Sequence, residues 1–317
     1  MTQTTVSAIV PLRELNELGR RCVERLLALD RELEVIVVSD RPEPGLDSRA
    51  VGLVVPGSTA AKRQAGLKRA HGELVALIDD DAYPHPSWLD VAERAFADPT
   101  IGAVCGPTLT PGDDSELEQL GGRVFASPLV AGPHRWRYVP LEPRDVDDAP
   151  SVNLVVRRTA ALDVGFETPV RYGEDTIFCE RLRRRGLRIR YEPGAIVFHS
   201  RRPLWGPHAR QVWRWSRRRG AFARSVGGNS LRPSYFLPSA LVAAAASYPL
   251  THGTARQAWW GAAAAYAAAC AAAGADRRPA NWVRLSLAIA LTHAVYGVGF
   301  LLGVASVPLP EQRESAS

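Results

Sequence analysis

The stretch that decides the fold is LVALIDDDAYPHPSWL, residues 74–89, in which an apolar run leads directly into three aspartates. A short apolar run is typical of a buried strand, so Asp79, Asp80 and Asp81 are expected at the carboxyl end of a strand over residues 74–78. Three adjacent carboxylates repel one another, and a divalent cation would relieve this, because Mg²⁺ and Mn²⁺ bind oxygen ligands. A solvated acidic turn or a helix N-cap is the alternative for an isolated run of this kind.

Strands and helices alternate around this stretch. Apolar runs predict further strands over residues 6–11, 34–39, 51–55, 101–105, 151–157 and 189–197. Helical spacing of apolar residues predicts helices over residues 15–29, 59–70, 84–97 and 175–185. This alternation indicates an α/β fold with a mostly parallel sheet and helices on both faces. In such sheets ligands bind beyond the carboxyl ends of the strands, which is where Asp40 and Asp79 are expected.

The rest of the chain differs from this pattern. Residues 113–150 are rich in proline, glycine and charge, and we expect irregular loops there. Residues 201–224 are strongly basic with interleaved aromatics. Their expected partner is an anionic membrane surface, with nucleic acid or the phosphate of a lipid-linked acceptor as alternatives. A nucleic-acid-binding module would not need the apolar final third, so no nucleic-acid partner is expected.

Three apolar stretches follow, at residues 235–250, 258–274 and 282–307. The last exceeds the roughly 20 residues that a helix needs to cross a bilayer, and buried helices of a soluble protein are the alternative for the first two. Three crossings would keep residues 201–224 and the second linker, which carries Arg277 and Arg278, on the inner side, in agreement with the positive-inside rule.

The expected domains follow from these features. They are a catalytic domain over residues 1–200, a basic interfacial segment over 201–234, two or three membrane helices over 235–307 and a tail over 308–317. The polar start of the chain shows no signal peptide, so we expect a multi-pass membrane protein whose first domain is cytoplasmic.

Composition narrows the function further. The 317 residues are 46% hydrophobic and 23% charged, with a net charge of +6, which suits phosphorylated ligands or anionic lipid. The four cysteines form no CxxC pair. A disulfide framework or a structural zinc site is therefore not expected.

Several motifs, in order, resemble the family 2 glycosyltransferases of the GT-A fold. The segment at residues 74–89 resembles their metal-binding region. The opening strand SAIVP, residues 7–11, and VIVVSD, residues 35–40, resemble the first strands, and AKRQAG, residues 61–66, resembles a helix start with Gln64 where the family has Asn. The segments SVNLVVRR, residues 151–158, and GEDTIFCERL, residues 173–182, resemble the stretch before the acceptor site and the Glu-Asp motif. The resemblance covers roughly residues 6–200.

The resemblance implies an inverting, metal-dependent transfer of a sugar from a nucleotide-diphosphate sugar, first of all a UDP-sugar. The acceptor would be a hydroxyl of a lipid-linked or exported glycan. Asp175 would be the catalytic base with Glu174 beside it, although paired carboxylates at a helix start are also favourable for charge reasons alone. Mg²⁺ or Mn²⁺ would be held by Asp81, Asp79 and His199.

The remaining roles concern the two substrates. The nucleotide sugar would meet Pro11, Arg13, Asp40, Lys62, Arg63, Asp79 and Asp80. The acceptor-side candidates are Asn153, Arg201 and Trp205. The alternatives are a nucleotidyltransferase-like enzyme, which would normally carry a glycine-rich loop after the first strand, and a catalytically inactive, membrane-anchored protein that binds sugar nucleotides.

Overall fold

The computed structural model describes residues 4–167, 173–225 and 231–306. The chain forms two compact units, Met1–Pro111 with Trp136–Ser200, and Gly112–Arg135 with Arg201–Ser317. The catalytic domain expected over residues 1–200 thus includes a segment, Gly112–Arg135, that packs with the second unit.

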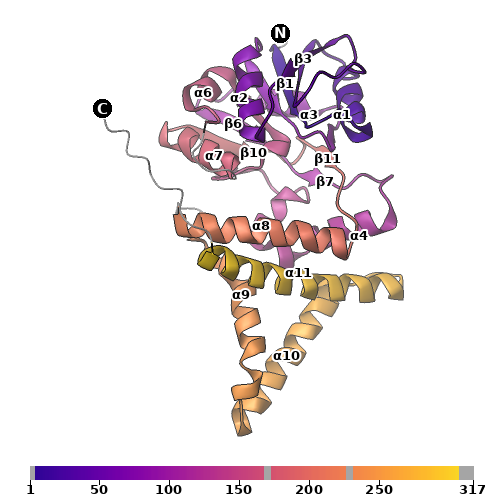
Figure 1. Ribbon diagram of the computed structural model, residues 1–317, viewed down its shortest axis with the longest axis vertical. Coiled ribbons are helices and arrows are strands. Elements are labelled where there is room, and N and C mark those ends of the chain that lie inside the picture. The colour runs from indigo at the N-terminus through magenta and orange to yellow at the C-terminus, as the bar shows by residue number, and fades with distance from the viewer. Residues whose placement is uncertain (1–3, 168–172, 226–230, 307–317) are drawn as a thin grey trace. The chain divides into compact units, whose positions relative to one another are not determined.

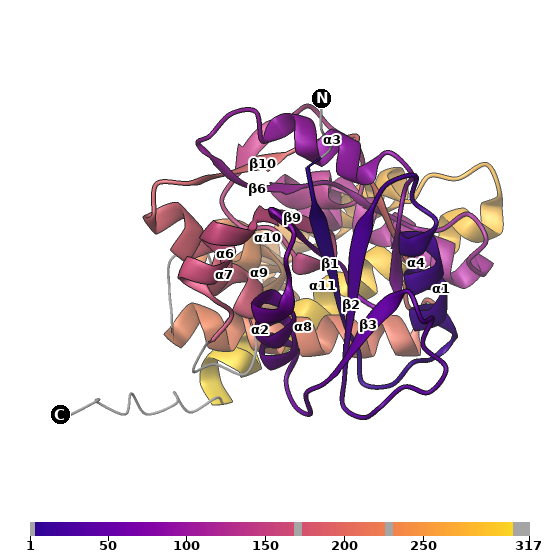
Figure 2. The same ribbon diagram turned by 90° about the horizontal axis from the view of Figure 1, so that it is seen from above.

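The first unit is built on an 8-stranded sheet in the order β3-β2-β1-β4-β9-β6-β10-β8. Its strands are β1 (Val6–Pro11), β2 (Leu33–Ser39), β3 (Ala50–Val54), β4 (Leu74–Leu77), β6 (Ile101–Cys105), β8 (Arg144–Val146), β9 (Leu154–Arg157) and β10 (Arg188–Tyr191). Figure 2 shows β1, β2 and β3 side by side, and these strands and β4 are parallel. Strand β9 runs antiparallel between β4 and β6, and β8 is antiparallel to β10. The predicted α/β fold with a mostly parallel sheet is confirmed.

A second, 3-stranded sheet has the order β5-β11-β7, with β5 (Ala82–Pro84), β7 (Thr108–Leu109) and β11 (Val197–His199). Strand β11 pairs antiparallel with β5 and places His199 opposite Ala82. The single strand predicted over residues 189–197 was wrong. Strand β10 ends at Tyr191, and β10 and β11 belong to different sheets.

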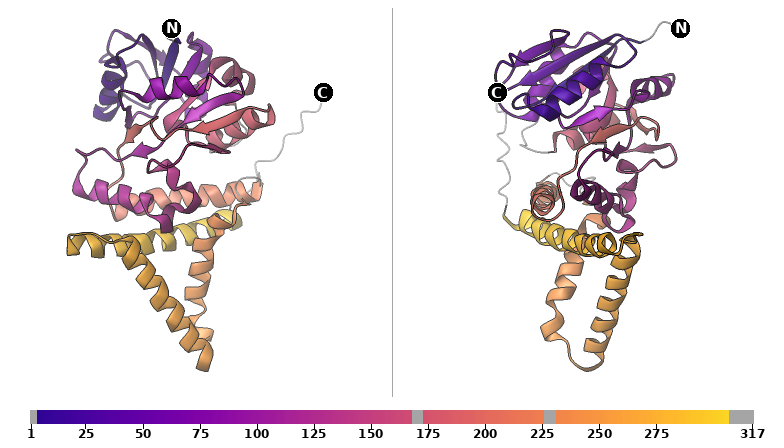
Figure 3. Two further views of the ribbon diagram at one scale, coloured as in Figure 1. Left: turned by 180° about the vertical axis from the view of Figure 1, so that it is seen from behind. Right: turned by 90° about the vertical axis from the view of Figure 1, so that its right-hand side faces the viewer.

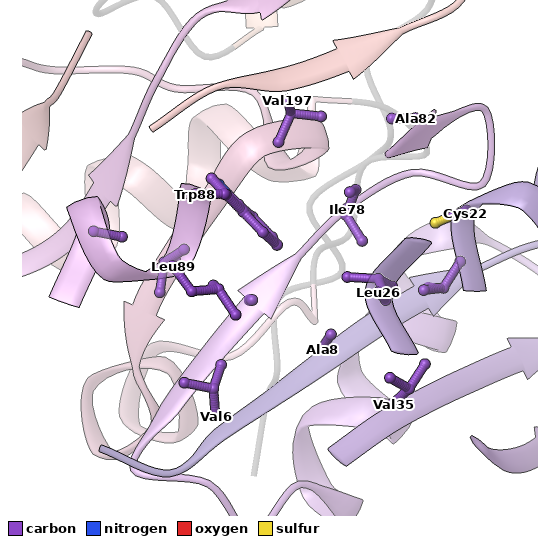
Figure 4. Packing of buried hydrophobic residues seen from close by; sticks show 14 of the residues in the cluster. Val6, Ala8, Cys22, Leu26, Val35, Ile78, Ala82, Trp88, Leu89 and Val197 are labelled. Carbon is purple, nitrogen blue, oxygen red and sulfur yellow. The ribbon is translucent and has the colours of Figure 1, made fainter. Parts of the chain in front are cut away.

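Helices cover both faces of the large sheet, as predicted. On one face are α1 (Glu17–Leu27) and α3 (Trp88–Ala95). Figure 4 shows Leu26, Trp88 and Leu89 near Val6 and Ala8 of β1, all in one buried cluster. On the other face are α2 (Thr59–Arg69), α6 (Arg158–Val164) and α7 (Glu174–Arg184), which pack on the residues of β1 and β4 that point the opposite way. The alternating side chains of the strands thus supply two separate apolar layers.

The second unit is helical. Its helices are α4 (Glu116–Ala126), α5 (Pro128–Ala131), α8 (Gly206–Ser225), α9 (Pro233–Ala246), α10 (Gly253–Ala273) and α11 (Pro279–Ser306). The expectation of irregular loops over residues 113–150 was wrong for α4. This helix starts with a capping box, in which Ser115 and Glu118 satisfy each other's backbone N–H groups.

Helices α8 and α11 lie side by side. Helices α9 and α10 extend from separate places along α11, on its side away from α8, and converge at their far ends (Figures 1 and 3). In the described part of the chain one helix, Pro279–Ala305 of α11, is long and apolar enough to cross a membrane, judged by its 27 residues and mean hydropathy of 1.9. Helix α9 is apolar but shorter, at 14 residues.

Candidate active site

The three aspartates follow β4, as predicted from the apolar run before them. The backbone turns sharply here, since the carbonyl of Asp79 accepts a hydrogen bond from the N–H of Ala82 at 3.1 Å. The thiol of the buried Cys22 lies 3.6 Å from the same carbonyl. All three aspartates are partly exposed, so the end of β4 presents carboxylates at the surface of an otherwise buried strand.

Arg63 of α2 joins this strand end to the start of α7. Its guanidinium donates to Asp79 Oδ1 at 2.7 Å, to Asp175 Oδ1 at 3.0 Å and to Glu174 Oε1 at 3.1 Å. The Arg63 side chain is only 4% exposed. One buried cation therefore holds together the two acidic motifs that the sequence predicted to act together.

Asp175 is oriented further by Ser151, in the turn that precedes β9. The Ser151 hydroxyl donates to Asp175 Oδ1 at 2.7 Å, and the Ser151 N–H donates to Oδ2 at 3.2 Å. Gly173, with φ of 84°, begins α7 in the left-handed region that suits glycine. The carboxylate is 27% exposed, so it is fixed in place yet open to a substrate.

The cluster shifts the pKa values of its members. Burial raises the pKa of Asp79, and Arg63 offsets only part of this effect. Burial and then the neighbouring Asp175 raise the pKa of Glu174. Burial lowers the pKa of the Arg63 guanidinium, but Asp175, Asp79 and Glu174 outweigh it and raise that pKa. The guanidinium therefore remains charged at any pH at which the fold persists.

Asp81 and His199 form a second pair next to this cluster. Asp81 Oδ1 lies 3.0 Å from His199 Nε2, and both side chains are less than one-fifth exposed. The pairing of β11 with β5 brings them together, and the N–H of Ser200 donates to the Asp81 carbonyl at 3.0 Å. Among the described residues no group of three or more His, Cys, Asp or Glu side chains gathers to hold a metal ion. The pair supplies one carboxylate and one imidazole.

Asp40 lies beyond the end of β2, beside the chain that leaves β1. Lys62 Nζ lies 2.6 Å from Asp40 Oδ1, the N–H of Gly57 donates to the same oxygen at 3.1 Å, and Arg13 Nε lies 3.9 Å from Oδ2. Lys62, and then the Gly57 N–H, hold the pKa of Asp40 below its usual value. Pro11 is the buried last residue of β1. Arg13, Asp40 and Lys62 thus form one polar group, while the guanidinium of Arg63 turns to the acidic cluster.

Asn153 occupies a different setting from the one expected of an acceptor-binding residue. It is 1% exposed, its amide oxygen accepts from Trp88 Nε1 at 2.8 Å, and its amide nitrogen donates to the carbonyls of Pro107 and Ala195. Both N–H groups are used inside the protein, so Asn153 fixes the core around β9.

Arg201 and Trp205 belong to the second unit. Arg201 is 5% exposed, and its backbone N–H lies 3.4 Å from Asp114 Oδ2. Trp205 is 37% exposed and has a φ of 80°, which is strained for a residue with a side chain. It stands immediately before α8.

Two contributors to the site were missed in the sequence. Ser151 orients Asp175 from 24 positions away, and no spacing rule connects the two. Gln64 accepts from the N–H of Phe166 at 2.7 Å and so ties α2 to the chain after α6. The position of Gln64 beside Arg63 was noticed only because it departs from the family pattern.

The comparisons with known proteins agree with this fold. The family model described as Glycosyl transferase family group 2 matches residues 74–301, and the chain belongs to this family. The first unit has the mixed α/β fold of GT-A glycosyltransferases. The Pyrobaculum calidifontis mannosyltransferase PcManGT, solved in complex with GDP-Man and Mn²⁺, matches with a TM-score of 0.57 and 20% identity over 93% of this chain and 87% of that chain.

Two curated glycosyltransferases are similar in sequence. The chain is 32% identical over 239 residues to the pre-mycofactocin glycosyltransferase of Mycobacterium tuberculosis, covering 72% of this chain and 48% of that protein. It is 24% identical over 223 residues to Glycosyltransferase AglE of Haloferax volcanii, covering 64% of this chain and 70% of that protein. The chain thus spans about half the length of the M. tuberculosis relative.

Proposed function

We propose that this chain transfers a sugar from a nucleotide-diphosphate sugar to an acceptor hydroxyl with inversion at the anomeric carbon. The observation that carries the proposal is the single buried guanidinium of Arg63, which joins Asp79 at the end of β4 to Glu174 and Asp175 at the start of α7. This contact brings a strand-end carboxylate and a helix-start carboxylate to one place, where both can act on one substrate.

Asp175 is the proposed general base. Direct attack by the acceptor hydroxyl inverts the configuration, the hydroxyl proton passes to the Asp175 carboxylate, and the nucleoside diphosphate leaves. Ser151 and Arg63 hold the carboxylate in one orientation, which is the requirement for a positioned base. Glu174 shares the Arg63 guanidinium and tunes the charge beside the base.

Asp81 and His199, with Asp79 nearby on the same turn, are the proposed holders of Mg²⁺ or Mn²⁺. A carboxylate and an imidazole fit Mn²⁺ well, and carboxylate oxygens fit Mg²⁺. Two protein ligands leave positions open for the oxygens of a diphosphate. Such a metal would compensate the charge that develops on the leaving diphosphate.

Asp40, with Lys62 and Arg13, is the proposed contact for the nucleotide, and Pro11 and Asp80 are further proposed contacts of the same donor. The base of the nucleotide is the open choice in this proposal. A UDP-sugar was the first expectation, and the similar mannosyltransferase was solved with GDP-Man, so both belong in a donor screen. The proposed acceptor is a lipid-linked or exported glycan, handled at the cytoplasmic face of a membrane to which the second unit attaches, with Arg201 and Trp205 as acceptor-side candidates.

A donor screen tests the proposal. The purified 317-residue chain with Mn²⁺ or Mg²⁺ is titrated with UDP-, GDP- and dTDP-sugars, and release of nucleoside diphosphate is measured. We expect sugars of one nucleotide class to bind and to be turned over. The Asp79→Ala/Asp81→Ala double variant should lose the metal-dependent release of nucleoside diphosphate. If no nucleotide sugar bound, or if the double variant behaved like the parent, the proposal would be abandoned.

A further inference from the structure

The second unit exposes an unusual amount of apolar side chain. Leu237 on α9 is 63% exposed, and Leu250 between α9 and α10 is 81% exposed. Other large apolar residues of this unit are also exposed: Phe236, Leu241, Trp260, Val283, Leu287, Val298, Leu301 and Leu302. Exposed apolar surface of this extent in a folded unit marks a surface that something else covers.

Helices α9 and α10 form a hairpin whose two helices meet at the tip and are each fixed to α11 at the base. At its tip Trp259 Nε1 donates to the carbonyl of Ala244 at 2.8 Å, and Tyr248 packs on Trp259. At its base Ser239 donates to the carbonyl of Gly297 at 3.1 Å, and Trp282 Nε1 donates to the carbonyl of Ala271 at 2.7 Å. Between tip and base the hairpin consists mainly of exposed alanines and other apolar residues.

Helix α11 runs parallel to α8 and in close contact with it. His208 and Thr292 share a hydrogen bond of 2.8 Å near the start of α8, and Arg224 donates to the carbonyl of Val304 at 3.0 Å near its end. Glycines allow the approach. A Cβ added to Gly220 or Gly303 would overlap the backbone of the opposite helix. The two helices are therefore packed together from one end of α8 to the other.

The α8–α11 pair is polarised across its thickness. With 3.6 residues per turn, the residues of α11 that face α8 (Thr292, Gly299, Gly303) lie roughly opposite an exposed stripe that is entirely apolar: Ala280, Val283, Leu287, Ala294, Val298, Leu301 and Ala305. On α8 the residues that face α11 (His208, Ser216, Gly220) lie roughly opposite exposed arginines: Arg210, Arg214 and Arg218. One side of the pair is thus apolar and the other is basic.

We infer that the α8–α11 pair lies flat in the headgroup region of a lipid bilayer, and that only the α9–α10 hairpin enters the lipid. The apolar stripe of α11 faces the acyl chains, and the arginines of α8 face water and the phosphates of anionic lipid. This inference rests on the proposed membrane attachment, but not on sugar transfer.

The packing of α11 decides against three crossings. A transmembrane α11 would carry α8 into the hydrocarbon with it, and charged side chains are costly there. The start of α11 is also tied to a charged group, since Arg278, just before the helix, and Arg284, in its second turn, each lie 3.5 Å from a carboxylate oxygen of Glu116 on α4. Length and composition alone favour a crossing, but the contacts on both halves of α11 favour an interfacial helix.

The charges at the hairpin ends fix its direction. Arg232 precedes α9, and Arg277 and Arg278 follow α10, so the basic residues gather at the base, while the tip carries Arg256 beside the ring of Tyr248. The positive-inside rule then places the base on the cytoplasmic side. If α11 does not cross, the number of crossings is even, and we expect the end of the chain on the same side of the membrane as the first unit; three crossings would put it on the other side of the membrane.

Sidedness of labelling tests the inference. All four native cysteines are buried, so the parent protein serves as a blank for a membrane-impermeant maleimide. One reporter is Glu73→Cys, at an exposed position of the first unit, and the other is a cysteine appended after Ser317. Both are expressed as full-length protein in a bacterial host and compared in intact cells and inside-out vesicles.

We expect both cysteines to react in inside-out vesicles and neither to react in intact cells. Labelling of the appended cysteine from the side opposite to Glu73→Cys would overturn the inference in favour of an odd number of crossings. Release of the protein by an alkaline carbonate wash would overturn the insertion of the hairpin. These readouts do not depend on activity, so failure of the topology and failure of the proposed sugar transfer can be told apart.

Discussion

Replacing Arg63 by methionine removes the guanidinium that contacts Asp79, Glu174 and Asp175 together. Breaking a buried charge pair by deleting one partner costs about 3–5 kcal/mol. The three carboxylates are between 17% and 34% exposed, so water takes over part of the lost interaction. We therefore expect a loss near the lower end, about 3 kcal/mol in the free energy of unfolding.

Lys68→Met is the matched control, because it removes a positive charge from the same helix. Lys68 lies 3.6 Å from Glu167, and the two side chains are 64% and 77% exposed. Exposed pairs of this kind contribute about 0–1 kcal/mol. Both variants are compared with the parent by denaturant unfolding at pH 7.5, followed by tryptophan fluorescence in detergent, and by nucleoside diphosphate release.

The pH dependence of the Arg63→Met deficit is a second readout. Without the guanidinium, the crowded carboxylates have folded pKa values above their unfolded ones, so the folded state gains protons as the pH falls. The deficit should therefore shrink between pH 7.5 and pH 5. If Arg63→Met and Lys68→Met unfolded within about 1 kcal/mol of each other, and both remained active, the role assigned to Arg63 would be wrong.

Three further changes test other parts of the structure. Asn153→Leu leaves buried partners of the amide unpaired and should cost about 2–4 kcal/mol in thermal unfolding. Burial lowers the pKa of His208 from 6.5 to about 4. As the pH falls, the unfolded protein therefore takes up this proton before the folded protein does, and the free energy of unfolding should fall by up to about 3 kcal/mol from pH 6.5 to 4. The His208→Gln variant should show a weaker dependence of stability on pH over this range. Leu237→Asp should lower partition into lipid vesicles at least ~10-fold, whereas Leu162→Asp, on an exposed site of α6, should not.

The sequence predicted the parts of the site that depend on local pattern. The apolar run before Asp79 predicted that the aspartates follow a buried strand, and the acidic start of α7 was visible at Glu174 and Asp175. The helix-start position of Arg63 led to its prediction as a nucleotide contact, which stays a prediction, and its three carboxylate partners were not visible in the sequence. Contacts between residues 63, 79 and 175 depend on the packing of α2 and α7 on one face of the sheet, and no spacing rule encodes that.

Two other expectations depended on tertiary contacts. Helix α4 carried its own signal, the capping pair Ser115 and Glu118, but Gly121 and Gly122 in its middle resembled a loop. Gly121 is explained by packing, because a Cβ there would lie 2.8 Å from the carbonyl oxygen of Arg202. The apolar composition of α11 predicted a membrane crossing. That α11 packs along the basic helix α8 depends on tertiary contacts, which the sequence does not show.

The catalytic claim rests on Asp175, and one measurement tests it most directly. Asp175→Asn keeps the shape of the side chain and removes the base, and Glu174→Gln on the same turn is the comparison. Single-turnover transfer is measured with the donor found in the screen, alongside donor affinity by titration.

The account predicts that Asp175→Asn retains donor affinity within about threefold and loses about 10²–10⁴-fold in the transfer rate. Glu174→Gln should lose less, because Glu174 contacts the Arg63 guanidinium and is not the proposed proton acceptor. An Asp175→Asn variant that transferred sugar at the parent rate, with donor affinity unchanged, would contradict the account.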